Sequence, residues 1–217
     1  MTSRRYEQRL RAETAEETRR RILDAVYERL RAAPTERLSL DQVAQSARVA
    51  RSTIYLIFGS RGGVFAAVAS DLLDRGGFDR VVKAVSHPDP RETIRLGLLA
   101  SCEVFAKSRD IYRVLLSSAM LDPDATAGAT QRSEKERAAG MKALATRLGE
   151  QGQLRADVSI DEAAHVLWLM TGFDAFDSLY TGRGLPVEEV ARLLTATAER
   201  TLCRPRRGSG RTAGGRA

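Results

Sequence analysis

The sequence predicts an all-α protein of about nine helices. Apolar residues recur at three- and four-residue intervals along nearly the whole chain, which is the period of amphipathic helices. No stretch alternates polar and apolar residues between hairpin turns, so we expect no sheet. Hydrophobic residues make up 43% of the 217 residues, which is enough to bury a sizeable core.

Capping residues and prolines set the bounds expected for the first four helices. The first should begin at Thr14, which stands three residues before a glutamate as in a capping box, and should end before Pro34. A short second helix should begin at Ser39. A third is expected over about 50–57, and a fourth after Ser60.

Five further helices are expected after the proline-rich segment 86–92. The first four of these should cover roughly 90–107, 110–121, 131–149 and 159–179, and the last should follow the turn 181–186. The final 14 residues, 204–217, are dominated by arginine, glycine and other small residues and cannot build a core.

Charge is distributed unevenly along the chain. Residues 1–62 carry 13 arginines against eight acidic residues, and residues 204–217 carry five arginines and no acidic residue. Because the net charge of the whole chain is only +7, the middle is mildly acidic. A codon bias toward arginine would not by itself leave the middle of the chain acidic. The basic N-terminal part therefore indicates a polyanionic partner.

Several features favour the cytoplasm. No apolar run approaches the roughly 20 residues of a membrane span, and the N-terminus lacks the apolar segment of a secretory signal. Cys102 and Cys203 lie far apart without the spacing of a metal site, so we expect reduced thiols.

Residues 38–57 have the spacing of a helix-turn-helix. Two short helices are separated by about three residues, and the small Ala44 and Ala47 lie where the helices would meet. Val49 would fill the turn, and Ile54 would face inward from the second helix of the pair. Helices that cross steeply allow only small side chains at their contact, so the pattern favours this motif.

The outward face of that second helix carries groups that suit DNA. Arg51 can bond guanine through two hydrogen bonds, and Ser52 and Thr53 can reach bases or phosphates. Tyr55 and Arg61 lie near the helix end, where phosphate contacts fix the register and do not read the sequence.

The stretch FGSRGG, residues 58–63, raises the alternative of a nucleotide-binding loop. No strand precedes it and no Lys-Ser/Thr pair follows it, so the frame of such a loop is absent. The amides of Gly62 and Gly63 could instead hold a DNA phosphate at a helix start. His87 and His165 have no nucleophile pattern beside them, so we expect no enzyme, no cofactor and no metal.

At these residues the sequence resembles the DNA-binding domain of TetR-type transcriptional regulators. The family frame is Gly-Val-Ser, then Thr, an aliphatic residue and Tyr, often a histidine, then Phe, Ser-Lys and an apolar residue. In this chain the frame falls on Arg48, Val49, Ala50, Thr53, Ile54, Tyr55, Ile57, Phe58, Ser60, Arg61 and Val64. The match covers about residues 16–68.

The departures from the frame concern the turn and the helix starts. Arg48 replaces the turn glycine, which costs on the order of 1 kcal/mol if the backbone is left-handed there. Ala50 replaces a serine cap, and Ile57 replaces a histidine that often contacts phosphate. Gly62 and Gly63 replace better helix formers. We hypothesise that Arg48 contacts the DNA backbone.

Together with the residue pattern, the resemblance implies four regions. These are a flexible basic arm (1–13), a helix-turn-helix DNA-binding domain (14–62), an effector-binding and dimerisation domain (63–203) and a disordered basic tail (204–217). The residues expected to bind DNA are Ser39, Arg48, Arg51, Ser52, Thr53, Tyr55 and Arg61.

The resemblance also implies a homodimer and a small-molecule pocket between helices of the larger domain. The candidate pocket residues are Phe105, Tyr112, Leu116, Met120, Met141, Leu144, Trp168 and Phe173. The candidate dimer interface is one stripe of the last helix, formed by Val187, Val190, Ala191, Leu194 and Ala198.

These expectations describe a transcriptional regulator, most simply a repressor that binds a palindromic operator as a dimer and is released by a small ligand. Two alternatives stay open at this point. One is a nonspecific, architectural DNA-binding protein, and the other is a helical small-molecule-binding protein without a regulatory DNA target.

Overall fold

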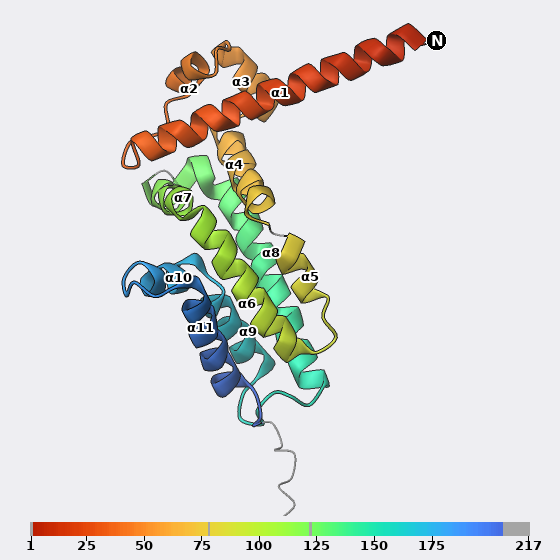
Figure 1. Ribbon diagram of the computed structural model, residues 1–217, viewed down its shortest axis with the longest axis vertical. Coiled ribbons are helices and arrows are strands. Elements are labelled where there is room, and N and C mark those ends of the chain that lie inside the picture. Colours follow the sequence, from red (N-terminus) through yellow and green to blue (C-terminus); the bar gives the residue numbers. More distant parts are fainter. Residues whose placement is uncertain (1, 78, 122, 206–217) are drawn as a thin grey trace, which may run out of the picture. The chain divides into compact units, whose positions relative to one another are not determined.

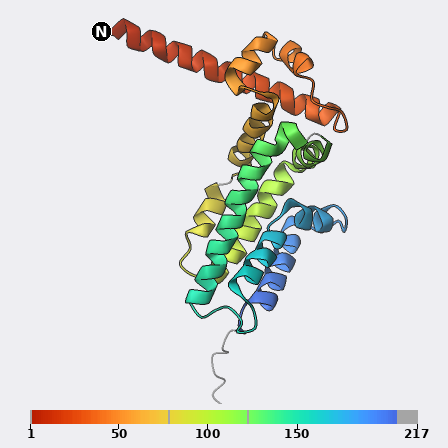
Figure 2. The same ribbon diagram turned by 180° about the vertical axis from the view of Figure 1, so that it is seen from behind.

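The computed structural model describes residues 2–77, 79–121 and 123–205, and the regular elements in these ranges are α-helices (Figure 1 and, from behind, Figure 2). The all-α prediction is confirmed. In chain order the helices are α1 (Thr2–Ala32), α2 (Leu40–Ser46), α3 (Arg51–Phe58), α4 (Arg61–Gly76), α5 (Asp79–Val85), α6 (Pro90–Lys107), α7 (Arg109–Leu121), α8 (Pro123–Glu150), α9 (Ile160–Met170), α10 (Phe173–Tyr180) and α11 (Val187–Leu202).

Helix α1 begins earlier than the sequence predicts. Thr14, expected as its cap, lies inside the helix, and its hydroxyl donates to the carbonyl of Leu10 at 2.9 Å. The hydroxyl of Thr18 donates to the carbonyl of Thr14 in the same way, at 2.8 Å. Threonine can satisfy its hydroxyl one turn back within a helix, so a capping pattern does not oblige the helix to start there. The described part of the expected flexible arm is therefore helical.

Helix α4 ends at a glycine, as the sequence indicated. Gly77 adopts a left-handed conformation with φ of 86°, and its amide donates to the carbonyls of Leu73 and Asp74. This is the usual glycine stop of a helix, because glycine pays no Cβ penalty there. The short α5 that follows was not predicted.

The helix expected over 159–179 is divided into α9 and α10. The hydroxyl of Thr171 donates to the carbonyl of Leu167 at 2.8 Å and ends the first part. Nη1 of Arg137, from α8, donates to the carbonyl of Trp168 at 2.5 Å. The backbone amide of Thr171 also donates to the Leu167 carbonyl, at 3.0 Å, so it is the carbonyl of Trp168 that depends on side-chain donors at the break.

The chain divides into two compact units. Of the described residues, the first unit comprises 2–77, 79–80, 103–121 and 123–136, and the second comprises 81–102 and 137–205. In the first unit α2 packs against α1 and α3, and α4 and α7 also contact α1. In the second unit α9 and α10 pack against α11 (Figure 1).

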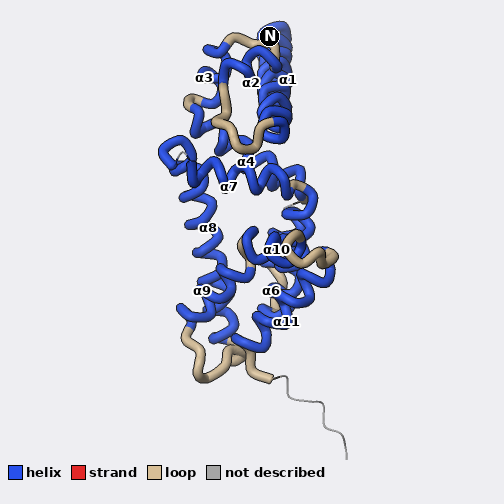
Figure 3. The backbone as a smooth tube through the Cα atoms, turned by 90° about the vertical axis from the view of Figure 1, so that its left-hand side faces the viewer, coloured by secondary structure: helices blue, strands red, loops and turns tan. Residues whose placement is uncertain are grey.

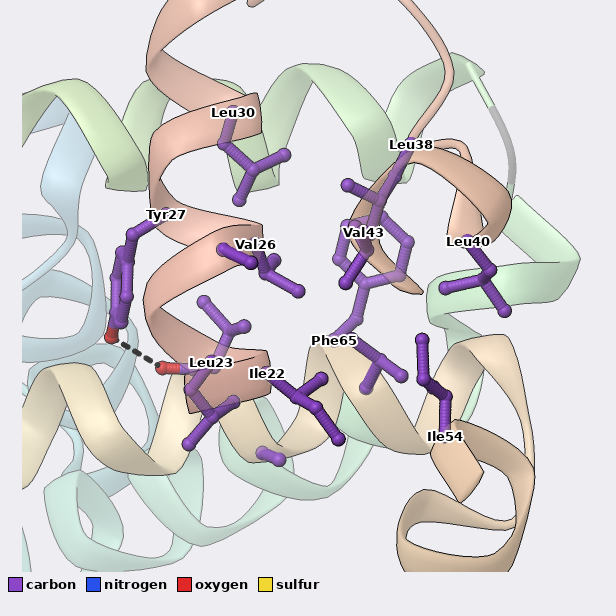
Figure 4. Close-up of a cluster of buried hydrophobic side chains, with 14 of the residues drawn as sticks. Ile22, Leu23, Val26, Tyr27, Leu30, Leu38, Leu40, Val43, Ile54 and Phe65 are labelled. Atoms are coloured by element: carbon purple, nitrogen blue, oxygen red, sulfur yellow. Dashed lines mark hydrogen bonds between the residues drawn. The ribbon is translucent and has the colours of Figure 1, made fainter. Parts of the chain in front are cut away.

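One hydrophobic core holds the first unit together (Figure 4). Ile22 and Val26 of α1 are fully buried beside Val43 of α2 and Phe65 of α4. Ile111 at the start of α7 is part of the same core. Each such side chain contributes about 1.5–3 kcal/mol when it leaves water, so these helices form one packed body.

A network of hydrogen bonds and ion pairs joins α1 to α4 at the edge of this core. The hydroxyl of Tyr27 donates to Asp71 Oδ2 at 2.7 Å. Arg75 forms ion pairs with Asp71 at 2.6 Å and with Asp24 at 3.0 Å, and its Cζ lies 5.1 Å from the centre of the Tyr27 ring. Burial and the hydrogen bond to Asp71 both raise the pKa of Tyr27. The hydroxyl is therefore protonated and donates at neutral pH.

The second unit has its own core and a polar cluster where α6 begins. Leu98, Leu148 and Phe176 are nearly or fully buried. The guanidinium of Arg147 donates to three backbone carbonyls of residues 85–88. Figure 3 draws the loops that connect the helices in tan. In two of these non-helical segments, Leu154 forms an isolated antiparallel bridge with Cys203.

Candidate nucleic-acid interface

Helices α2 and α3, with the turn 47–50 between them, form the helix-turn-helix that the sequence predicts. The turn is closed by backbone hydrogen bonds from Arg48 to Gln45 at 3.1 Å and from Val49 to Ala44 at 3.0 Å. Arg48 is the non-glycine residue with positive φ among the described residues, at 53°. The backbone at this turn position is therefore left-handed, with an arginine in place of glycine.

The inner side of the motif is packed as expected. Ala44 and Ala47 are 6% and 4% exposed, and Ile54 of α3 is 1% exposed. Val49 is half-buried and packs on the same core. The small alanines let the two helices approach closely, which fixes the orientation of α3 relative to α2.

The outer side of α3 faces solvent. Arg51, Ser52 and Tyr55 are exposed, Thr53 is half-buried, and Leu56 is 86% exposed. A leucine so exposed has no packing role within the chain, and an apolar side chain at this position suits a thymine methyl group. The structure thus brings most of the predicted base-reading residues together on one face of one short helix.

Arg51 is held in place before any partner arrives. Its Nη1 donates to both carboxylate oxygens of Asp41 on α2, at 3.0 and 2.9 Å. Its Nη2 donates to the hydroxyl of Tyr55 at 3.2 Å. The Tyr55 hydroxyl and the Asp41 charge both raise the pKa of Arg51, which stays a cation. Sequence reasoning missed Asp41, because an acid ten residues before an arginine follows no helical period.

The start of α4 is built by Ser60 and a glycine. Ser60 Oγ accepts a hydrogen bond from the amide of Gly63 at 3.0 Å. A Cβ at position 63 would lie 1.8 Å from the carbonyl oxygen of Phe58, so only glycine fits there. Arg61, predicted to contact phosphate, is half-buried with Cζ 5.9 Å from the centre of the Phe65 ring.

The start of α2 carries the last predicted contact, Ser39. Its Oγ accepts from the amide of Gln42 at 3.4 Å, which confirms the cap expected from the sequence. Ser39 and Ser60 therefore mark two helix N-termini, whose amides and dipoles suit phosphate groups.

Comparisons with known proteins agree with this geometry at the level of the fold. No family model matches the chain, and no curated protein matches it. Among solved structures, a TetR-like transcriptional regulator from Rhodococcus sp. RHA1 is 24% identical with a TM-score of 0.62, over 85% of this chain and 94% of that one. NalD of Pseudomonas aeruginosa is 20% identical with a TM-score of 0.68, over 88% and 98% of the two chains. KstR2 of Mycobacterium tuberculosis is 17% identical with a TM-score of 0.62, over 86% and 96%.

This chain has the TetR-type fold. The likeness extends over most of the chain, well beyond the stretch in which the sequence resembles the family. In this fold the helix-turn-helix motif is formed by α2 and α3.

The candidate pocket residues fall in both units. Phe105 and Tyr112 form an edge-to-face pair with ring centres 5.1 Å apart, and burial raises the pKa of Tyr112 to about 12. Leu116 and Met120, also in the first unit, are 39% and 85% exposed. In the second unit Leu144 and Phe173 are buried, Met141 is half-buried and Trp168 is 40% exposed.

The stripe predicted as a dimer interface is packed inside a single chain. Val190, Ala191, Leu194 and Ala198 are at most 6% exposed, and Val187 is half-buried. The amphipathic pattern of α11 was correct, but the partners of its apolar side are α9 and α10 of the same chain. Periodicity identifies a face that is covered and does not tell which chain covers it.

The described residues contain no group of histidine, cysteine and acidic side chains that could hold a metal ion. Within the same residues no single helix is long and apolar enough to cross a membrane. Helix α3 and the larger part of α4 reach the length and hydropathy of a membrane span only when taken together, and the two are bent by 65°.

Proposed function

We propose that the protein is a DNA-binding transcriptional regulator of the TetR type, in which α3 enters the major groove of a palindromic operator. The observation that carries this proposal is the exposed face of α3. Donors and acceptors (Arg51, Ser52, Tyr55) and an apolar group (Leu56) stand there on a helix whose inner side is packed rigidly. Such a set can discriminate base edges, whereas phosphate contacts alone cannot.

The neighbours in structure favour a repressor over the alternatives. NalD is the secondary repressor of the MexAB-OprM multidrug efflux pump, and KstR2 is a ketosteroid transcriptional regulator. We propose the same role here, in the cytoplasm, without enzymatic activity and with release from DNA by a small molecule. A ligand can release the protein only by binding more tightly to a conformation whose two helix-turn-helix motifs no longer fit the operator.

A homodimer is part of this proposal, because a palindrome needs two reading helices. We propose that α9 contributes to the dimer surface in place of the covered stripe of α11. Leu169 is 60% exposed and its neighbour Trp168 is 40% exposed, which is unusual for side chains of their size.

Selection from random-sequence DNA tests the proposed function. A regulator should enrich one palindrome with half-sites about one helical turn apart, and should bind it at least about 10³-fold more tightly than scrambled DNA. An architectural protein would show only steeply salt-dependent binding without enrichment. No DNA binding at all would leave the helical small-molecule-binding protein as the remaining alternative.

A further inference from the structure

An acidic side chain, Asp41, lies against the face of α3 that the proposed function assigns to DNA. Both its carboxylate oxygens accept from one nitrogen of Arg51, at 2.9 and 3.0 Å. The other terminal nitrogen of Arg51 donates to Tyr55, whose ring centre lies 5.6 Å from the guanidinium carbon. One guanidinium is therefore held from α2 and from the next turn of α3.

Stability does not account for this arrangement. The side chains of Arg51 and Asp41 are 53% and 69% exposed, and ion pairs so exposed contribute little to folding. Helix α3 is fixed instead by its inner side, where Ile54 is buried. A carboxylate on a surface that approaches phosphates also weakens binding by repulsion. Asp41 also lies in the first turn of α2, where the helix dipole stabilises a carboxylate. That interaction does not require the contact with Arg51, so it leaves the ion pair itself unexplained.

The ion pair changes what Arg51 contributes to binding. An unpaired arginine strengthens binding to any sequence, because it neutralises a phosphate and releases counterions. With Asp41 attached, the pair has no net charge and adds nothing to this sequence-independent term. The guanidinium is nevertheless already oriented, so it loses less freedom when it meets a base edge that offers two acceptors.

We propose that Asp41 is a positioning residue for DNA selectivity: it holds Arg51 so that this arginine reads a base, most favourably a guanine, and does not serve as a phosphate anchor. The inference rests on the proposed function and deepens it. It assigns to α2 a part in sequence discrimination through a side chain that touches no base itself.

The experiment measures the DNA affinity of the wild-type protein and of Asp41→Asn over a series of salt concentrations. Two duplexes are used: the sequence that the wild-type protein enriches from random DNA, and a scrambled version of it. Asp41→Asn should bind scrambled DNA roughly 3- to 10-fold more tightly, with a slope of log K against log salt steeper by about 1. Affinity for the selected duplex should change by less than about 2-fold, so the selectivity ratio falls. Asp24→Asn is the matched control, because it removes a carboxylate from another exposed ion pair of the first unit, with Arg75 at 3.0 Å.

Three results would overturn the inference. The ratio of affinities could be unchanged in Asp41→Asn, or Asp24→Asn could lower it equally, which would assign the effect to net charge. The Asp41→Asn change could also alter the salt slope as much in an Arg51→Ala background as in wild type, which would show that the carboxylate does not act through Arg51. A wild type that selects no sequence overturns the proposed function and this inference together, whereas the three results above concern a wild type that does select one.

Discussion

At the scale of single residues, Arg48 combines a strained backbone with a position beside α3, the helix proposed to enter the major groove. Its φ of 53° costs an L-residue on the order of 1 kcal/mol, a penalty that glycine avoids. Arg48→Gly should therefore raise the free energy of unfolding by about 1 kcal/mol, less the entropy that glycine adds to the unfolded chain. If Arg48 contacts a phosphate, the same variant should bind all DNA sequences more weakly, with a salt slope shallower by about 1.

Arg48→Lys is the control for this prediction. It keeps the charge and the L-configuration, so stability and the salt slope should both stay near the wild-type values. Urea unfolding and fluorescence anisotropy with labelled DNA measure the two quantities. A raised melting temperature with unchanged DNA affinity in Arg48→Gly would refute the contact and leave only the strain.

Two tyrosines of the first unit, Tyr27, which is buried, and Tyr112, which is half-buried, should make the stability fall at alkaline pH. Burial raises the pKa of Tyr112 to about 12, and burial with the Asp71 hydrogen bond also raises the pKa of Tyr27. In the unfolded chain both hydroxyls ionise near pH 10, so their contribution to stability is complete below about pH 10. The contribution of Tyr112 is lost as the pH rises toward about 12, and that of Tyr27 is lost as the pH rises through its own raised pKa.

Urea unfolding between about pH 8 and pH 11 measures this loss. Tyr112→Phe should flatten the fall in unfolding free energy above about pH 10, because phenylalanine has no proton to lose. Tyr6→Phe, at a tyrosine that is 61% exposed, should leave the profile unchanged. Equal profiles for wild type and Tyr112→Phe would contradict the prediction.

At the scale of elements, the first turn of α4 requires its glycine. Gly63 stands where a Cβ would lie 1.8 Å from the Phe58 carbonyl oxygen, so an added methyl group must push α3 and α4 apart. Gly63→Ala should lower the free energy of unfolding by about 1–3 kcal/mol. Gly140→Ala, within α8 and with no atom near its Cβ position, should instead raise it by about 0.5–1 kcal/mol. The midpoints of denaturant unfolding measure both changes. An unchanged free energy of unfolding in Gly63→Ala would show that the turn can relax.

Helix starts were predictable from the sequence where one local group determines them. Ser39 and Ser60 cap α2 and α4 as expected, and Ser159 caps α9 at the start of the helix expected over 159–179. An N-cap needs only its own side chain and an amide three residues on. The break between α9 and α10 was not predictable, since Arg137 stabilises it from another helix. Similarly, the start of α1 was misplaced because its threonine satisfies itself within the helix.

The candidate site divides in the same way. The outward face of α3 was predicted from its helical period; Arg51, Ser52 and Tyr55 are exposed there, whereas Thr53 is half-buried. The role of Asp41 could not be predicted from the helical period, because its contact with Arg51 depends on how α2 and α3 cross. For α11 the helical period predicted which face is covered but not what covers it. The stripe expected at the dimer interface is buried within this chain, where α11 packs against α9 and α10.

At the scale of the whole molecule, dimerisation should decide the affinity for an operator. Light scattering should give a dimer at micromolar concentration, and Leu169→Glu should give a monomer, because a carboxylate would then face the partner. The monomer should bind a half-site normally but lose about 10²–10⁴-fold in affinity for the full palindrome, since the second motif is no longer held nearby. Val85→Glu is the matched control, a similar change at an aliphatic residue of α5 that is 52% exposed. A monomeric wild type, or an unchanged dimer in Leu169→Glu, would remove α9 from the proposed interface.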